Sequence, residues 1–154
     1  MAARLTSDRR MDVQATTRGR VIAWVLLTIL GLVNVAGYVL DLYARFWWFD
    51  RILHACTILA VTLWLALFMC NRVLRGGRGR DVLVVLMIAS VGLAIGALWE
   101  VAEWAFDRIA PGDVIKGKHD TIIDTVMDTA GAVLAGLASL TFLKPSPRAG
   151  GHVR

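Results

Sequence analysis

Charged side chains are scarce in this sequence. Asp, Glu, Lys and Arg make up 19% of the 154 residues, whereas hydrophobic residues make up 57%. An ordinary water-soluble domain carries about 25% charged residues. The composition therefore excludes a typical soluble domain and predicts a protein embedded in the lipid bilayer, and the length leaves room for one domain.

Cysteine is also scarce, because Cys56 and Cys70 are the only two in the chain. Both lie in one apolar segment, 14 residues apart, which corresponds to about 21 Å along a helix. A disulfide requires Cα atoms within about 7 Å of each other. This spacing excludes a disulfide between them, and two cysteines are too few for a disulfide framework or a cysteine-based metal site.

The net charge of +5 raises the question of nucleic-acid binding, which requires basic residues on a solvated face. The basic residues instead flank apolar segments, and four arginines lie in one short loop at Arg72, Arg75, Arg78 and Arg80. Such flanking positions are typical of a membrane-topology signal. We therefore expect no nucleic-acid partner.

Four apolar segments are long enough to cross the roughly 30 Å of bilayer hydrocarbon as helices. The sequence predicts an all-α bundle of four transmembrane helices, forming a single domain from 21 to 143. A polar tail precedes the bundle, and a tail rich in proline and glycine, expected to be disordered, follows it. The predicted parts are 1–20, 21–42, 50–74, 82–109, 121–143 and 144–154.

Lys and Arg residues predict the orientation, because they are retained on the cytoplasmic side. Of the 17, five lie in 1–20, four in the loop 71–80 and three in 144–154, against five on the other side. Both termini are therefore predicted to be cytoplasmic. We expect a multi-pass protein of the bacterial inner membrane.

Acidic residues show the opposite distribution, since nine of the 12 lie at or near the predicted outer helix ends. Their spacing matches the helical period, so each set shares one helix face. The three sets are Asp50 with His54; Glu100, Glu103 and Asp107; and Asp120, Asp124 and Asp128. The alternating topology directs all three sets to the same end of the bundle.

Glu100 and Asp128 lie about two turns inside their predicted helices, roughly 10 Å from the helix ends. An ionised carboxylate at that depth costs a few kcal/mol unless it is protonated, paired with a cation or bound to a metal. Acidic side chains at a helix end are also common on solvated surfaces, and the helix dipole favours Asp in the first turn of a helix. This simpler interpretation suits Asp107 and Asp120 better than the deeper acids.

The pattern therefore predicts a divalent-metal site, without distinguishing Mg, Mn, Fe or Zn. The candidate metal ligands are Glu100, Glu103, Asp124 and Asp128. The candidate catalytic residues are His54, as a ligand or general base, and Asp50. The candidate contacts to a substrate phosphate are Arg51, Lys116 and Lys118.

The acidic motifs resemble those of the YjdF-like family of bacterial inner-membrane proteins, over about residues 48–140. The resemblance lies in Asp50-x-x-x-His54, Trp99-Glu100-x-x-Glu103-Trp104-x-x-Asp107 and Asp120-Thr121-x-x-Asp124-x-x-x-Asp128. The Asp-x-x-x-His segment also shows a looser similarity to VanZ-like proteins. The resemblance implies a small helical membrane protein, and the VanZ-like similarity implies an envelope or lipid-linked setting.

Three functions are compatible with these patterns. The first is a metal-dependent enzyme acting on a lipid or isoprenoid phosphate. The second is a structural or assembly subunit in which the acids form a polar network or receive a basic partner. The third is a proton or cation transport component, which would need an oligomer or a partner subunit because the predicted cytoplasmic helix halves are apolar.

Overall fold

The computed structural model describes residues 12–68, 81–110 and 114–146, and it is almost entirely helical. Four of its helices are long and apolar enough to cross a membrane. This confirms the predicted all-α transmembrane bundle. In chain order the elements are β1 (Asp12–Ala15), α1 (Thr17–Val39), α2 (Leu42–Arg45), α3 (Phe49–Phe68), α4 (Asp81–Ile109), α5 (Lys118–Phe142) and β2 (Leu143–Ser146).

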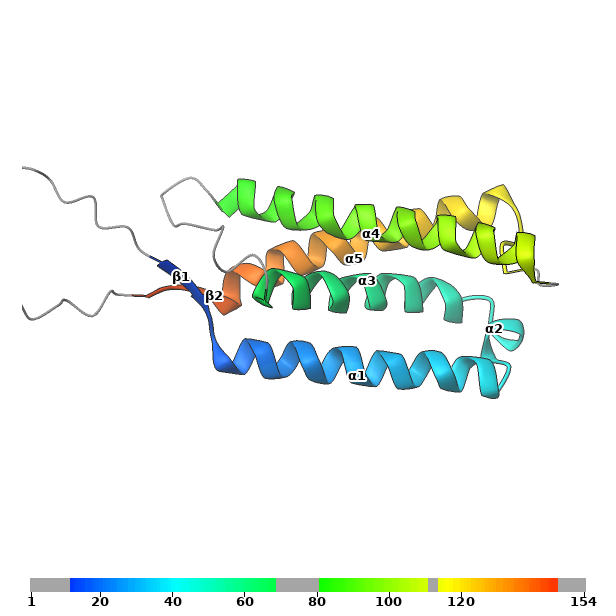
Figure 1. The fold of residues 1–154 in the computed structure, drawn as a ribbon, viewed down its shortest axis with the longest axis horizontal. Helices are drawn as coiled ribbons and strands as arrows, with labels where there is room; N and C mark the ends of the chain where they lie inside the picture. The colour runs from blue at the N-terminus through cyan, green and yellow to red at the C-terminus, as the bar shows by residue number, and fades with distance from the viewer. Residues whose placement is uncertain (1–11, 69–80, 111–113, 147–154) are drawn as a thin grey trace, which may run out of the picture.

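The long helices run side by side along the length of the molecule (Figure 1). Helix α5 packs extensively against both α3 and α4, whereas α1 packs mainly against α3. Three helices therefore form a close core, and α1 lies at its edge. The short helix α2 connects α1 to α3 at the end remote from the strands (Figure 1).

Small residues allow α3, α4 and α5 to approach closely. A Cβ atom added at Gly131 of α5 would collide with the backbone of Ala55 in α3. A Cβ atom added at Gly92 of α4 would lie 2.5 Å from the Thr62 hydroxyl and 2.6 Å from Cβ of Ala132. Helix contacts in membranes depend on such packing, because lipid tails supply no hydrophobic force between helices.

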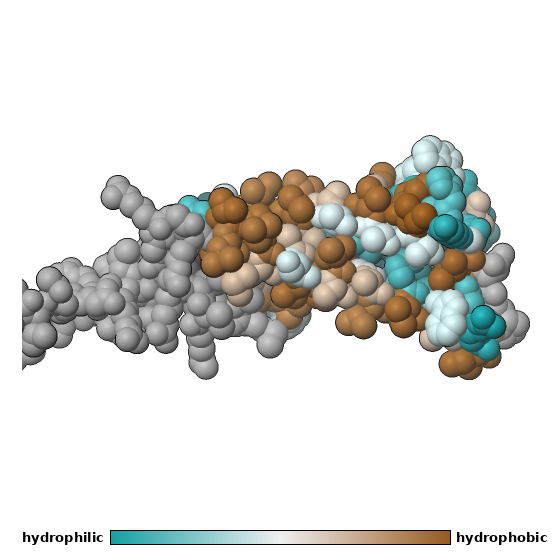
Figure 2. Space-filling model, turned by 90° about the horizontal axis from the view of Figure 1, so that it is seen from above, coloured by the Kyte–Doolittle hydropathy of each residue, from teal (hydrophilic) through white to brown (hydrophobic). Residues whose placement is uncertain are grey.

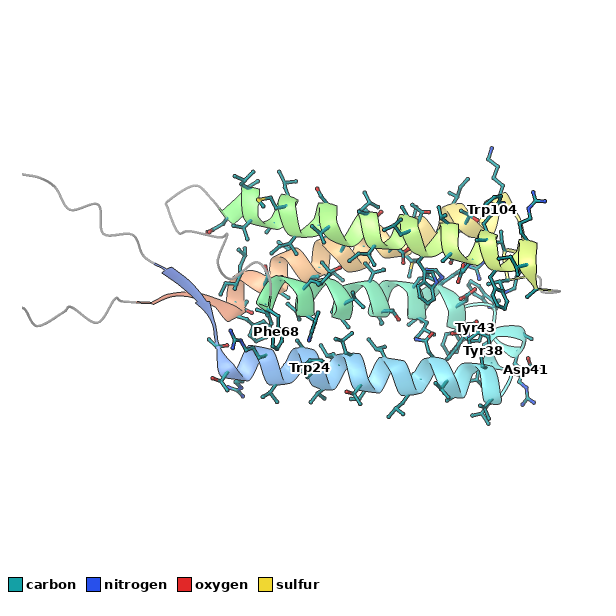
Figure 3. The ribbon with its side chains drawn as sticks, in the orientation of Figure 1. Trp24, Tyr38, Asp41, Tyr43, Phe68 and Trp104 are labelled. Carbon is teal, nitrogen blue, oxygen red and sulfur yellow. The ribbon has the colours of Figure 1, made fainter. Side chains whose placement is uncertain are left out.

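Aromatic rings separate α1 from α3 near the strand end. The ring of Trp24 in α1 lies edge-on to Trp64 and Phe68 of α3, with centroid distances of 5.3 and 5.9 Å. Figure 3 shows Trp24 and Phe68 facing each other between the two helices. These rings fill the space at this end of the α1–α3 contact.

Large apolar side chains cover the outside of the helices. Leu32 of α1, Leu98 of α4 and Leu134 of α5 are each more than half exposed. Figure 2 shows apolar residues over the middle of one face and hydrophilic residues gathered at the end remote from the strands. Such a surface suits contact with lipid, as expected for helices that cross a membrane.

The strands β1 and β2 pair antiparallel, with Asp12 opposite Ser146 and Ala15 opposite Leu143. The prediction of a disordered tail from residue 144 is therefore wrong for 144–146, because their backbone pairs with the segment before α1. Residues 147–154 of that tail lie outside the described residues. The strand pair also brings both ends of the described chain to one end of the bundle (Figure 1).

Helix ends differ from the predicted bounds where capping, rather than hydropathy, decides them. Helix α1 begins at Thr17 instead of 21, since the hydroxyl of Thr16 accepts a hydrogen bond from the Gly19 amide at 3.1 Å. It ends at Val39 because Asp41 adopts a left-handed conformation, with φ of 58°. Such a residue interrupts the helical hydrogen-bond ladder. The predicted segment 69–74, with Cys70, and the loop 71–80 lie outside the described residues.

Candidate functional site

His54 lies at the centre of the polar end of the bundle. It belongs to α3 and is 8% exposed. Its Nδ1 atom lies 3.1 Å from Oδ1 of Asp128 in α5 and 3.9 Å from Oε1 of Glu100 in α4. Its Nε2 atom lies 3.8 Å from Oδ1 of Asp50, one turn earlier in α3. A single imidazole ring therefore contacts acids from three helices.

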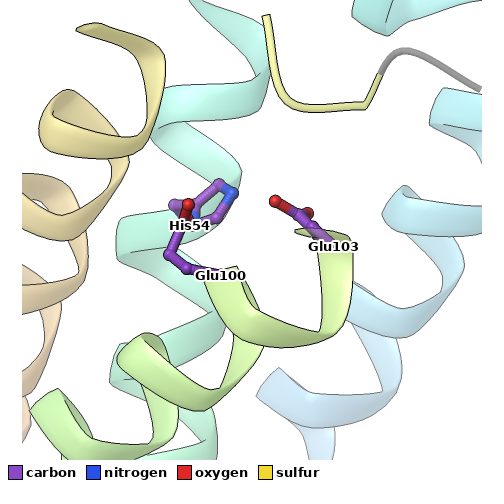
Figure 4. A group of neighbouring side chains, drawn as sticks. All are labelled: His54, Glu100 and Glu103. Carbon is purple, nitrogen blue, oxygen red and sulfur yellow. Dashed lines mark ion pairs between the residues drawn. The ribbon is translucent and has the colours of Figure 1, made fainter. Parts of the chain in front are cut away.

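Two groups of side chains have the composition of metal ligands. The first group, His54, Glu100 and Glu103, has one ligand atom per residue, all within 4.8 Å of one another. Figure 4 shows both glutamates of α4 beside the His54 ring of α3. Metal–ligand bonds of just over 2 Å place ligand atoms up to about 4 Å apart, so small side-chain movements would close this group around an ion.

The second group consists of Asp50, Asp120 and Asp124, with ligand atoms that also lie within 4.8 Å of one another. Two basic side chains already contact it. Nη2 of Arg51 lies 3.4 Å from Oδ1 of Asp120, and Nζ of Lys116 lies 3.8 Å from Oδ2 of Asp50. This group is therefore better balanced in charge than the first group.

Three buried carboxylates carry an oxygen without a hydrogen-bond donor in the described part of the chain. These oxygens are Oε1 of Glu100, Oδ1 of Asp124 and Oδ2 of Asp128, in residues that are 7%, 3% and 1% exposed. A buried carboxylate oxygen that accepts no hydrogen bond carries a large desolvation penalty. Each of the three would be stabilised by a bound cation or a proton.

The close approach of α4 to α5 explains how Asp128 comes to be buried. A Cβ atom added at Gly96 of α4 would lie 2.5 Å from Oδ2 and 2.8 Å from Cβ of Asp128. Glycine at this position therefore leaves the space that the Asp128 side chain fills. One turn later in α4, Glu100 lies beside His54, the histidine that Asp128 also contacts.

Hydrogen bonds hold the surroundings of the two groups in place. Trp99 Nε1 donates to Oε1 of Glu103 at 2.7 Å. The Asp107 carboxylate accepts from the amides of Val114 and Ile115 at 3.0 and 2.9 Å, which ties the segment before α5 to α4. Asp107 therefore has a structural role here, which the interpretation of it as a solvated helix-end acid did not include.

Tyr43 of α2 adds a polar contact from the edge helix. Its hydroxyl donates to Oδ1 of Asn34 in α1 at 3.0 Å. Burial, together with the nearby Tyr38 and Asp50, raises the pKa of the Tyr43 phenol above its usual value of 10.0. The phenol therefore remains a neutral hydrogen-bond donor. Figure 3 shows Tyr38 and Tyr43 together at this end of α1.

A cavity of about 850 Å³ lies between α1 and the faces of α3 and α4. Its polar end is lined by Asp50, His54, Glu103 and Lys116, together with Asn34 and Tyr43. Along α1 and α3 the lining becomes largely apolar, with Leu27, Leu30, Val35, Ile58 and Val61. One continuous space thus joins the acidic groups to the apolar flank of the bundle.

A family of proteins described as "Predicted membrane protein (DUF2238)" matches residues 2–145 of this chain. The chain belongs to this family. An "Uncharacterized protein" of Thermotoga maritima is 30% identical over 118 residues, covering 75% of this chain and 58% of that protein. The chain thus spans less than two thirds of that relative's length. No solved structure matches the present chain.

Membership of the family agrees with the helical bundle. The chain is a membrane protein, and its described residues hold four helices long and apolar enough to span a membrane. The YjdF-like resemblance is consistent with this family, and the VanZ-like similarity stays a prediction. The orientation of the termini also stays a prediction. The structure adds that β1 and β2 lie at the end opposite the acidic groups (Figure 1).

Most of the predicted site residues come together at this end. Glu100 and Glu103 join His54 in the first group, and Asp50 and Asp124 lie in the second group. Asp128 belongs to neither group and contacts the first through Nδ1 of His54. The predicted phosphate contacts divide, because Arg51 and Lys116 lie beside the second group whereas Lys118 is exposed at the start of α5.

Asp120 is more buried than expected for an acid at the start of a helix. We interpreted it as a helix-start acid, but it is 9% exposed and belongs to the second group. Its i, i+4 spacing to Asp124 placed the two acids on one helix face, and that spacing was the better guide to its burial than its position at the start of the helix. The contact of Tyr43 with Asn34 had no such signal, because it depends on the turn between α1 and α2.

Proposed function

We propose that the first group, His54, Glu100 and Glu103, binds a divalent metal ion and that the protein uses it in a reaction on the phosphate of a membrane lipid. The observation that carries this proposal is the buried Oε1 of Glu100, which accepts no hydrogen bond within the described residues and lies beside the His54 ring. A cation at this point would supply the missing interaction.

The contact of His54 with Asp128 supports the proposal. Nδ1 of His54 lies 3.1 Å from Oδ1 of Asp128. An ionised carboxylate only accepts hydrogen bonds, so within this proposal we assign the proton to Nδ1, which would donate to Asp128. In the neutral ring of this tautomer the lone pair is on Nε2, which would be the nitrogen that binds a metal. The Glu100 side chain, whose Oε1 lies 3.9 Å from Nδ1, would have to move toward Nε2 to share that ion. Histidine ligands of metals usually donate their other ring N–H to a carboxylate, which fixes the tautomer and the ring orientation. Asp128 would be such a positioning residue.

Local charge also supports a bound cation. The two groups and Asp128 together hold six carboxylates, against the side chains of Arg51 and Lys116 and the ring of His54. Most of these acids are buried, where the low dielectric strengthens their mutual repulsion. A divalent cation would offset much of this repulsion.

A phosphate-bearing lipid is the substrate class that suits the surroundings. A metal ion can polarise a phosphoryl oxygen and lower the pKa of a bound water, and these effects serve phosphoester chemistry. Arg51 and Lys116 contact Asp120 and Asp50 of the second group. Asp50 in turn lies 3.8 Å from His54 of the first group, so a phosphate held by the metal could also reach these two basic side chains. The cavity that begins at this group continues between membrane-spanning helices, where lipid is the available molecule. Within this proposal, the setting is the bacterial inner membrane.

Metal analysis of the detergent-purified protein tests the metal site. We expect stoichiometric metal in the wild type after supply of Mg, Mn, Fe and Zn, and loss of most of it in Glu100→Gln. Asp81→Asn is the matched control, because Asp81 lies on the same helix at its opposite, exposed end. A wild type without metal under all four supplies would refute the site and favour a protonated polar network in a structural subunit.

The enzymatic part of the proposal has a separate test. Purified protein in vesicles containing a lipid monophosphate should change that lipid in a metal-dependent manner, measured by phosphate release and by mass spectrometry of the lipid. We expect at least a tenfold lower rate in Glu100→Gln and an unchanged rate in Asp81→Asn. If the protein binds metal but leaves a panel of lipid phosphates unchanged, the metal site stands and the proposed reaction is wrong.

A further inference from the structure

The cavity beside α1 has the form of a groove with a polar end and an apolar flank. From α1 it is lined by residues between Leu27 and Tyr38, a distance of about 16 Å along the helix axis. Val35 and Gly31 in this lining are exposed, so the groove opens to the side of the bundle. Its volume of about 850 Å³ lies within the range of small-molecule sites.

The two ends of the groove are bordered by different kinds of residue. Helix α1 packs mainly against α3, so the space between α1 and α4 stays open. Toward the strands, the rings of Trp24, Trp64 and Phe68 fill the α1–α3 contact. Toward the other end, the groove reaches His54, Glu103 and Lys116. A molecule in the groove would therefore have its polar part at the acidic groups and its apolar part in the middle of the bundle.

We propose that this groove receives one long hydrocarbon chain of a lipid monophosphate, which enters sideways from the bilayer between α1 and α4. This inference rests on the proposed function, because the metal ion supplies the charge that attracts the phosphate to an otherwise acidic site. The ammonium group of Lys116, which lines the polar end, adds a second positive charge. The apolar lining and the surrounding bilayer match the chain.

The chemistry of the groove distinguishes its occupant from lipid that merely surrounds the protein. Surrounding lipid contacts exposed residues such as Leu32 and Leu134. A chain in the groove would contact Leu30 of α1 and Val61 of α3 at the same time, with its phosphate beside His54. The proposed occupant needs one hydrocarbon chain and a terminal phosphate. Both acyl and prenyl lipids include molecules of this kind.

Gly31 offers a way to block the groove without disturbing the helix contacts. It lines the cavity, and a Cβ atom added there meets nothing within 4 Å. Gly31→Phe should therefore place its ring in the open groove. Leu32→Phe is the matched control, because Leu32 is the next residue of α1, is 66% exposed and is absent from the cavity lining.

The experiment uses a single-chain alkyl phosphate with a photoreactive diazirine in its chain, added to the full-length protein in vesicles. We expect crosslinks mapped by mass spectrometry to concentrate on Leu30, Val61 and their neighbours. Gly31→Phe should reduce this labelling at least tenfold, whereas Leu32→Phe should not change it. Unlabelled farnesyl phosphate and dodecyl phosphate should compete, whereas two-chain phosphatidic acid should compete at least tenfold less well.

The outcomes separate this inference from the metal proposal. Equal labelling of groove and outer residues, unchanged labelling in Gly31→Phe or competition by phosphatidic acid alone would overturn the groove inference. Metal content is measured on the same samples. A protein that binds metal but shows even labelling refutes only the groove inference, whereas a protein without metal refutes the proposed function itself.

Discussion

Helix α3 contacts its two neighbours in different ways. Against α5 it packs through small residues, so that Gly131 lies directly on the backbone of Ala55. Against α1 it packs through the rings of Trp64 and Phe68. The close contact brings His54 within hydrogen-bond distance of Asp128, and the wider contact accompanies a cavity. Residue size at the two interfaces thus separates the buried contact between His54 and Asp128 from the cavity beside α1.

The largest expected effect comes from breaking the close contact. Gly131→Leu would push α5 away from the Ala55 backbone and separate Asp128 from His54. Overpacking of this kind costs about 3 kcal/mol when backbone has to move. We expect a clear loss of thermal stability in detergent, measured by circular dichroism. Gly31→Leu is the control and should leave the melting temperature nearly unchanged, because nothing lies within 4 Å of that position. Equal melting temperatures would contradict the close contact.

The next largest effect tests the role of Asp128 in the close contact between α3 and α5. Asp128→Asn keeps the size of the side chain but weakens the acceptor for the Nδ1–H of His54. Loss of such a partner lowers metal affinity by about 10- to 100-fold, measured by titration calorimetry with Mn²⁺. Asp120→Asn should change this affinity little, because Asp120 lies in the second group beside Arg51. A larger loss in Asp120→Asn would place the ion in the second group.

The smallest effect tests the wider contact. Trp24→Ala removes two edge-on ring contacts, with Trp64 and Phe68. Each such aromatic pair contributes about 0.5 to 1.5 kcal/mol, so we expect a moderate loss of stability with unchanged metal affinity. Trp104→Ala is the control, since Trp104 is similarly exposed and its ring contacts Arg108 instead. Weaker metal binding in Trp24→Ala would show that the two contacts of α3 are coupled.

Several features could be predicted because they depend on local sequence. Hydrophobic length predicted the four spans, which the structure confirms. The helical period placed Glu100 and Glu103 on one face of α4, and both lie beside His54. These features follow from a repeat of 3.6 residues per turn and from the thickness of the bilayer, neither of which requires knowledge of distant residues.

Other features could not be predicted because they depend on partners far apart in the chain. The pairing of β1 with β2 joins residues 12–15 to 143–146, and their composition carries no clear strand signal. The burial of Asp120 depends on the arrangement of α3 and α5, with Arg51 at 3.4 Å. The edge position of α1 was not predicted by hydropathy either, because the mean hydropathy of α1, 2.1, lies between those of α4, 2.5, and α5, 1.4.

The sequence by itself determined that this is a helical membrane protein with acids gathered on helix faces at one end, because hydropathy and periodicity are properties of consecutive residues. Only the tertiary structure decided which acids share a group, that Asp128 holds His54, and that a cavity reaches them from α1. These outcomes depend on where glycines and aromatic rings set the distance between helices, and that distance is a property of pairs of segments.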